Sequence, residues 1–134
     1  MKKVLLQGRG LTKVFTQGQT NNKALDEVDV DIFEKDFTII MGSSGAGKST
    51  LLYALSQMDA VTEGTVSYRG QELTRLKAKQ LAKLRAEEFG FVFQQTHLVS
   101  NLTLYENVAV AGFLGKKGSS SQIQRPAQNL LTQM

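Results

Sequence analysis

Hydrophobic residues recur along the chain with two periods, a period of two that predicts strands and a period of three to four that predicts helices. The strand-like segments are residues 4–6, 11–15, 28–32, 37–41, 65–68 and 91–93. In the third segment, apolar residues alternate with aspartates, which is typical of an antiparallel strand with one wet face. Residues 37–41 form a continuous apolar run before a glycine, so we expect a central strand covered on both faces. Gly8 and Gly10 should separate the first two strands, and a polar loop over residues 16–23 should follow them.

The helix-like segments follow the fourth and fifth strands and also close the chain. Apolar residues spaced three and four apart predict a helix that begins near Lys48 and an amphipathic helix around residues 76–84. A third helix is expected over residues 104–111, followed by a flexible break rich in glycine and serine over residues 112–121. Pro126 suits the first turn of a last helix, whose apolar stripe runs to the final residue without a cap. The whole pattern predicts an α/β fold with an added antiparallel β layer.

Composition narrows the class of protein. With 134 residues, 41% of them hydrophobic and 21% charged, the chain has the size and apolar content of one globular domain. It has no cysteine, which excludes disulfides and thiolate metal sites. The net charge is +4, and much of the basic charge lies between Arg69 and Arg85 with the spacing of a helix face, which favours a solvated surface over a nucleic-acid site. No apolar run approaches the roughly 20 residues of a membrane span, so any membrane role is expected to come through a partner.

A glycine-rich segment carries the strongest chemical signal. Residues 42–50 spell GSSGAGKST, which fits the complete phosphate-binding pattern of P-loop proteins, follows an apolar run and opens a predicted helix. Glycines at these positions allow positive φ and a close approach of the backbone to phosphates, which N–H groups and a helix N-terminus attract. The candidate nucleotide-binding residues are Gly42, Ser43, Ser44, Gly45, Ala46, Gly47, Lys48, Ser49 and Thr50.

Three residues at the end of this motif have separate expected roles. Lys48 should bridge β- and γ-phosphate oxygens, the Ser49 hydroxyl should bind Mg²⁺, and Thr50 should hydrogen-bond the α-phosphate. The alternative is a glycine-rich turn that happens to be followed by lysine and serine. On this motif alone a kinase, a GTPase and a transporter ATPase all stay open.

A second motif, FVFQQTHLVSNLTLYENV, spans residues 91–108. It resembles the glutamine-loop region of ABC-transporter ATPases and lies at the distance after the P-loop lysine that is usual in that family. The resemblance extends over essentially the whole chain and, through the Phe-Gly-Phe-Val-Phe-Gln sequence that ends at Gln94, is strongest with exporters of lipoproteins, macrolides and peptides. It implies an incomplete P-loop NTPase (RecA-like) core with an antiparallel β subdomain and the start of a helical subdomain. Residues 1–134 would be a partial nucleotide-binding domain, with the core and β layer in 1–95 and the helical subdomain beginning in 96–134.

The same resemblance implies site residues, cofactors and a partner. Phe15 matches the aromatic residue that stacks on adenine, although the residue alone is better interpreted as an ordinary strand end. Gln94 matches the glutamine that coordinates Mg²⁺ and senses the γ-phosphate, so Lys48 and Gln94 are the candidate catalytic residues and Ser49 and Gln94 the candidate metal ligands. Thr96–Glu106 corresponds to the surface that docks an integral-membrane permease, which would place the protein at the cytoplasmic face of the cell membrane.

Departures from the family pattern limit the expected activity. Lys35-Asp36 replaces the usual Glu-Gly turn, and Ser43 stands where proline is common; neither should prevent phosphate binding. The L-S-G-G-Q signature, the strand ending in Asp-Glu and the switch histidine do not occur in the sequence, and a hydrolase without them should be very slow. We therefore expect a fragment of an ATP-binding subunit that would dimerise with ATP in the full-length protein and that here binds Mg-ATP at most. A non-catalytic regulatory module and a non-functional truncated product remain alternatives. Exposed apolar surface and self-association are expected at residues 37–41 and 91–93.

Overall fold

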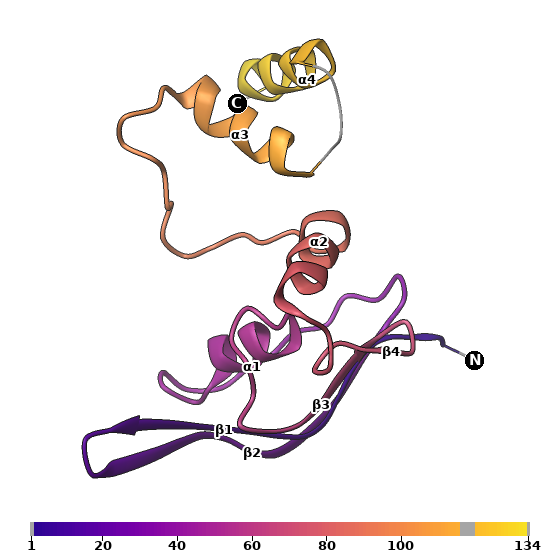
Figure 1. Cartoon of the computed structure of the whole chain (residues 1–134), viewed down its shortest axis with the longest axis vertical. Helices are drawn as coiled ribbons and strands as arrows, with labels where there is room; N and C mark the ends of the chain where they lie inside the picture. The colour runs from indigo at the N-terminus through magenta and orange to yellow at the C-terminus, as the bar shows by residue number, and fades with distance from the viewer. Residues whose placement is uncertain (1, 116–119, 134) are drawn as a thin grey trace. The chain divides into compact units, whose positions relative to one another are not determined.

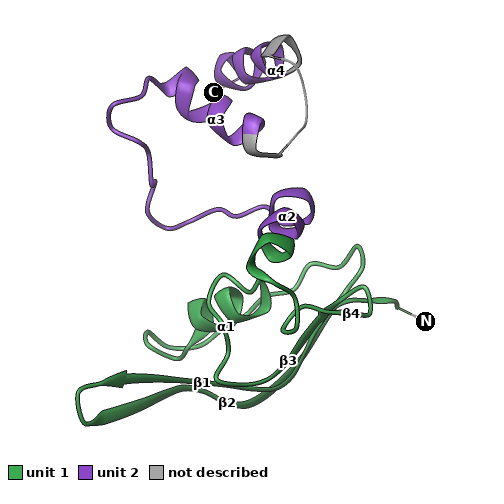
Figure 2. Ribbon diagram, in the orientation of Figure 1, with its two compact units in different colours: residues 1–81 green, residues 82–134 purple. Residues whose placement is uncertain are grey.

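A computed structural model describes residues 2–115 and 120–133 of the chain. The chain divides into two compact units, residues 1–81 and residues 82–134 (Figure 2). The boundary falls within one helix, α2, which spans Ala78–Glu88. The domain division expected at residue 95 stays a prediction.

The first unit is built on a four-stranded antiparallel sheet with the strand order β2-β1-β3-β4 (Figure 1). The strands are β1 Val4–Gln17, β2 Thr20–Phe33, β3 Glu63–Tyr68 and β4 Gln71–Glu72. The first two form a long hairpin in which Gln17 pairs with Thr20. Gly18, at a φ of 60°, is the first residue of the two-residue turn, where type II′ turns require glycine. Residues 16–23 are therefore the tip of the hairpin, and the prediction of a loop there was wrong.

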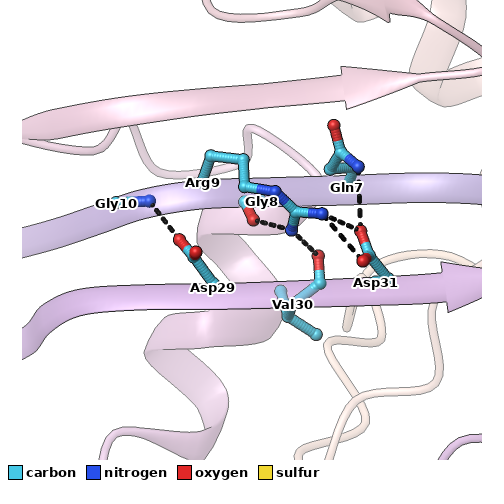
Figure 3. A network of polar contacts seen from close by, with 7 residues as sticks. All are labelled: Gln7, Gly8, Arg9, Gly10, Asp29, Val30 and Asp31. Atoms are coloured by element: carbon cyan, nitrogen blue, oxygen red, sulfur yellow. Dashed lines mark hydrogen bonds and ion pairs between the residues drawn. The ribbon is translucent and has the colours of Figure 1, made fainter.

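Gly8 and Gly10 lie inside β1, so the predicted break between two short strands was also wrong. The pairing of β1 with β2 shifts register between Gly8 and Leu11, and Gly10 has a φ of 57°. The N–H of Gly10 donates to Asp29 Oδ1 at 2.7 Å (Figure 3). A Cβ at Gly64 on β3 would clash with the Gly10 carbonyl oxygen. The glycines thus serve a bulge and a close backbone approach within a continuous strand.

An ion pair joins the two strands of the hairpin beside this bulge. Both carboxylate oxygens of Asp31 accept hydrogen bonds from Arg9 Nη2 at 2.7 Å, and Gln7 donates to the same carboxylate at 2.9 Å (Figure 3). The hydrogen bonds from Arg9 and then Gln7 hold the pKa of Asp31 below its usual range, and the carboxylate raises the pKa of Arg9. Arg9 also donates to the carbonyl oxygens of Gly8 and Val30, so one side chain joins both strands.

The core of this unit lies between the sheet and helix α1, which spans Lys48–Leu55 and packs against β1 and β2. Its largest fully buried side chains are Leu11, Val66 and Leu73. The prediction of a helix beginning near Lys48 is confirmed. The helix ends at Leu55, and Met58, three residues beyond its end, is 45% exposed.

The two predicted buried strands at residues 37–41 and 91–93 do not form. Phe37, Met41 and Val92 are 87%, 84% and 103% exposed, and both segments lack strand structure. A strand persists only where neighbouring strands pair with its backbone, and the described residues place none beside either segment. The expected exposure of apolar surface is confirmed, whereas self-association stays a prediction.

The second unit contains the helices α3, Leu104–Gly115, and α4, Ser120–Thr132. The helices predicted around residues 76–84 and 104–111 are confirmed as α2 and α3. Gly112 belongs to α3 rather than to a break, and a Cβ there would lie 2.8 Å from Ile123 Cγ2 on α4, so glycine permits the close packing of the two helices. Residues 116–119 of the expected break lie outside the described residues. Pro126 stands inside α4 rather than in its first turn, because the helix begins six residues earlier than the proline signal suggested.

Candidate functional site

The P-loop enters α1 through glycines in the left-handed region. Gly45 and Gly47 have φ values of 80° and 82°, and Gly47 is the N-terminal cap residue of the helix. The Ala46 N–H donates to the Ser43 carbonyl at 3.2 Å, and the Leu51 N–H donates to the Gly47 carbonyl at 2.8 Å. The positive φ values expected at Gly45 and Gly47 are confirmed, whereas Gly42, for which the motif also predicted one, does not adopt a positive φ.

Gly47 also fixes the loop against the hairpin. A Cβ at this position would lie 2.5 Å from the carbonyl oxygen of Ala24 and 3.5 Å from Leu25 Cδ2, both on β2. The backbone of the P-loop and that of β2 therefore approach to a distance that only glycine allows. This contact determines where the helix N-terminus lies relative to the sheet.

The P-loop carries positive charge from the Lys48 ammonium and from the N-terminus of α1. Lys48 Nζ donates to the carbonyl oxygens of Gly42 at 2.9 Å and Ser43 at 2.5 Å. The first turn of α1 has no acidic residue, and no side chain of the described residues caps its N-terminus. The free N–H groups and the helix dipole favour an anion at this point, as the ammonium does.

A cavity of about 290 Å³ opens beside this helix N-terminus. It is lined by Phe15, Asn22 and Ala24 from the hairpin and by Gly45, Ala46, Gly47, Lys48, Ser49 and Thr50 from the P-loop. The fold thus brings Phe15 together with the second half of the predicted phosphate-binding motif. Gly42, Ser43 and Ser44 are exposed residues of the same loop that do not line the cavity.

Asn22 was missed by the sequence reasoning. It pairs with Phe15 across the hairpin, which brings its polar side chain to the cavity. The segment around it is a run of polar residues without alternation, and the loop prediction followed from that run. The available signal was Gly18, a turn residue with strands of equal length on either side.

Gln94 lies in the second unit and is an exposed residue of an irregular segment. Beside it the rings of Phe89, Phe91 and Phe93 stack in sequence with centroid distances of 6.4 and 5.7 Å, and His97 meets Phe93 edge-on at 5.1 Å. Within the described residues, no three His, Cys, Asp or Glu side chains gather in a group that could hold a metal ion.

The segment that precedes α3 is held in a defined conformation. Thr103 and Glu106 form a capping box, in which Glu106 Oε2 accepts from the Thr103 N–H at 2.7 Å and the Thr103 hydroxyl oxygen accepts from the Glu106 N–H at 3.2 Å. The Thr103 hydroxyl also donates to Glu106 Oε2 at 2.8 Å. The pKa of Glu106 is lowered chiefly by the hydrogen bond from the Thr103 N–H and then by that from the Thr103 hydroxyl. Asn107 Oδ1 accepts from the Val99 N–H, and Asn107 Nδ2 donates to the carbonyls of Val99, Leu102 and Thr103. The apolar side chains of this segment face solvent, with Leu98 56% and Leu104 66% exposed.

Comparison with known proteins decides the family. Residues 25–134 match the family described as ABC transporter. This chain belongs to the ABC transporter family. Over 131 residues it is 38% identical to the macrolide export ATP-binding/permease protein MacB of Wolinella succinogenes, an alignment that covers 98% of this chain and 20% of MacB.

Solved structures of the family confirm the fold. The chain is similar, at 34% identity and a TM-score of 0.88, to the dimeric ATP-binding cassette MJ0796 in a post-hydrolysis state bound to ADP and Pi. A second dimeric structure of MJ0796, a bacterial ABC transporter cassette, gives a TM-score of 0.89. Each match covers 96% of this chain and 56% of the cassette. The expected P-loop NTPase class with an antiparallel β subdomain is therefore confirmed, for a chain that spans just over half of the cassette and a fifth of MacB. Of the helices that the structure describes, none combines the length and hydropathy required to span a bilayer.

Proposed function

We propose that this chain is the nucleotide-binding part of an ABC exporter, in which it binds Mg-ATP and couples this binding to transport by a membrane permease. The observation that carries the proposal is the cavity that joins Phe15 to the P-loop and the N-terminus of α1. The hairpin contributes an aromatic ring to the lining of this cavity, and the P-loop contributes N–H groups, hydroxyls and an ammonium. A nucleoside triphosphate has the matching chemistry, a flat base at one end and an anionic tail at the other.

The P-loop residues have separable roles in this proposal. Lys48 would exchange its bonds to the loop carbonyls for phosphate oxygens, and Thr50 would donate to the α-phosphate. The exposed Ser49 hydroxyl at the cavity would bind Mg²⁺, which supplies charge neutralisation between phosphate oxygens. This oxygen ligand suits a hard cation. Gln94 is proposed as the second metal ligand and γ-phosphate sensor on the family resemblance.

Hydrolysis of ATP is the general activity of this family, and for this chain we propose Lys48 and Gln94 as the residues that act in it. MJ0796 in its complex with ADP and Pi is a dimer. A dimer that forms with ATP is accordingly part of the proposal.

The permease is proposed to dock on Thr96–Glu106, at the cytoplasmic face of the membrane. This segment presents Leu98, Val99 and Leu104 to solvent, and Asn107 and the capping box hold it on the end of α3. An exposed apolar surface on a fixed backbone suits docking, because little conformational entropy is lost on association. MacB is named as a macrolide export ATP-binding/permease protein, which supports the association of this chain with a permease.

Thermal unfolding with and without Mg-ATP tests the nucleotide site. A ligand that binds only the folded state at about 100 times its Kd stabilises it by about 2.7 kcal/mol, so the wild type should melt at a clearly higher temperature with Mg-ATP. Lys48→Ala should abolish most of this shift, whereas Lys79→Ala, at an exposed position of α2, should retain it. An absent shift in the wild type, or equal shifts in the wild type and Lys48→Ala, would refute the proposed function.

A further inference from the structure

Lys13 is a lysine of the β1 strand whose side chain is only 13% exposed. Its Nζ donates to Asp59 Oδ1 at 2.6 Å and to the Ala60 carbonyl at 2.6 Å. The same ammonium lies 5.1 Å from the centroid of the Phe15 ring, two residues along the strand. One cation therefore contacts both the ring that lines the cavity and a segment that follows α1.

The anchor of this lysine is itself fixed to the helix. The N–H of Asp59 donates to the Tyr53 carbonyl at 3.2 Å, and the N–H of Met58 donates to the same oxygen at 2.9 Å. Tyr53 belongs to the last turn of α1, the helix whose first turn lines the cavity. A continuous series of contacts thus runs from the P-loop helix through Asp59 and Lys13 to Phe15.

Phe15 needs such support because its ring is otherwise little constrained. The ring belongs to a residue that is 42% exposed, near the tip of a two-stranded hairpin. Two-stranded ribbons are only marginally stable by themselves. A cation held by two hydrogen bonds restricts the ring to orientations that keep its face against the ammonium.

We propose that Lys13 is a positioning residue for the base of the bound nucleotide: anchored by Asp59 and Ala60, it holds Phe15 in the orientation that receives the base. The proposal rests on the proposed function, because it concerns the same cavity. It assigns Lys13 to base binding alone, since Nζ is bonded to the segment after α1 and Lys13 does not line the cavity.

The size of the effect follows from the strength of one cation–ring contact. At partly exposed sites such a contact corresponds to a factor of about two to five in an equilibrium constant. Loss of the ammonium should therefore weaken binding of Mg-ATP by about two- to fivefold. Binding of inorganic tripolyphosphate with Mg²⁺, which has no base, should be unchanged.

The experiment measures the affinities of both ligands for a set of folded variants by titration calorimetry. Lys13→Met keeps the apolar stem and removes the charge, Lys13→Arg keeps a cation, and Asp59→Asn weakens the anchor at a half-buried position. We expect Lys13→Met and Asp59→Asn to weaken Mg-ATP selectively and Lys13→Arg to restore it. Lys23→Met is the matched control, because Lys23 is an exposed lysine of the same hairpin that pairs with Asp26.

Two further variants separate this inference from the proposed function. Phe15→Ala should weaken Mg-ATP alone, and Lys48→Ala should weaken both ligands. If the wild type binds neither ligand, the proposed function fails and the inference fails with it. If Lys48→Ala behaves as expected while Lys13→Met changes neither affinity, or lowers both equally, only the positioning role is overturned. Asp59→Asn decides the matter if Lys13→Met does not fold.

Discussion

The contact between the P-loop and β2 predicts that Gly47→Ala destabilises the fold far more than the same change at Gly45. Both glycines have nearly the same φ, 82° and 80°, so a Cβ at either one meets the same left-handed backbone penalty of about 1–2 kcal/mol. At Gly45 the new Cβ would have no atom within 4 Å, whereas at Gly47 it would lie 2.5 Å from the Ala24 carbonyl oxygen.

The size of the difference follows from which atoms must move. A backbone oxygen of a paired strand cannot rotate away, so Gly47→Ala must shift β2 or the loop, and overpacking of this kind costs about 1–3 kcal/mol. The total for Gly47→Ala is then about 2–5 kcal/mol, against about 1–2 kcal/mol for Gly45→Ala. The difference between the two variants isolates the contact from the backbone strain.

Urea unfolding followed by circular dichroism measures both variants under one condition. With a urea dependence of about 1–3 kcal/mol per molar, the midpoint of Gly47→Ala should lie roughly one molar below that of Gly45→Ala. Equal midpoints would show that the contact between Gly47 and the Ala24 carbonyl does not fix the P-loop against β2.

Two further predictions concern the polar contacts of each unit. Because Arg9 holds the pKa of Asp31 below its usual range, the carboxylate stabilises the fold above about pH 4, and this contribution is lost as the pH falls through the lowered pKa of the folded state. Unfolding free energy measured from about pH 5 to about pH 2 should therefore fall less for Asp31→Asn than for the wild type, and parallel curves for the two proteins would contradict the role of the pair. In the second unit, Asn107→Ala should speed hydrogen exchange of the Val99 backbone amide by about three- to tenfold, the equivalent of roughly one hydrogen bond. Unchanged exchange of this amide would show that the Asn107 side chain does not hold the segment that precedes α3.

The parts of the fold that depend on residues close together in the sequence were predictable from the sequence alone. The start of α1 at Lys48 follows from a local motif, and so do the positive φ values of Gly45 and Gly47. The helices α2 and α3 have an apolar periodicity that needs no distant partner to be visible. Phe15 could be assigned to the site only through the family resemblance, since nothing local distinguishes it from an apolar residue at the end of a strand.

The errors at Gly10 and at Phe37–Met41 share a physical cause, which is that the deciding contact lies far away in sequence. Gly10 suggests a break locally, but its N–H is satisfied by Asp29 on the next strand, so the strand continues through a bulge. Phe37–Met41 has the composition of a central strand and becomes one only where neighbouring strands pair with it. Pro126 favours a helix start, yet the residues before it already form α4.

The bonds from Lys48 to the carbonyls of Gly42 and Ser43 have a thermodynamic consequence for the arrival of a ligand. A long, flexible lysine side chain loses up to about 2 kcal/mol of rotamer entropy when it is ordered, and here that loss belongs to folding rather than to association. An incoming phosphate therefore exchanges one set of oxygen acceptors for another around an ammonium that is already in place. In the ligand-free loop the ammonium of Lys48 is already ordered by carbonyl oxygens. Phosphate binding then replaces these hydrogen-bond acceptors more than it rearranges the protein.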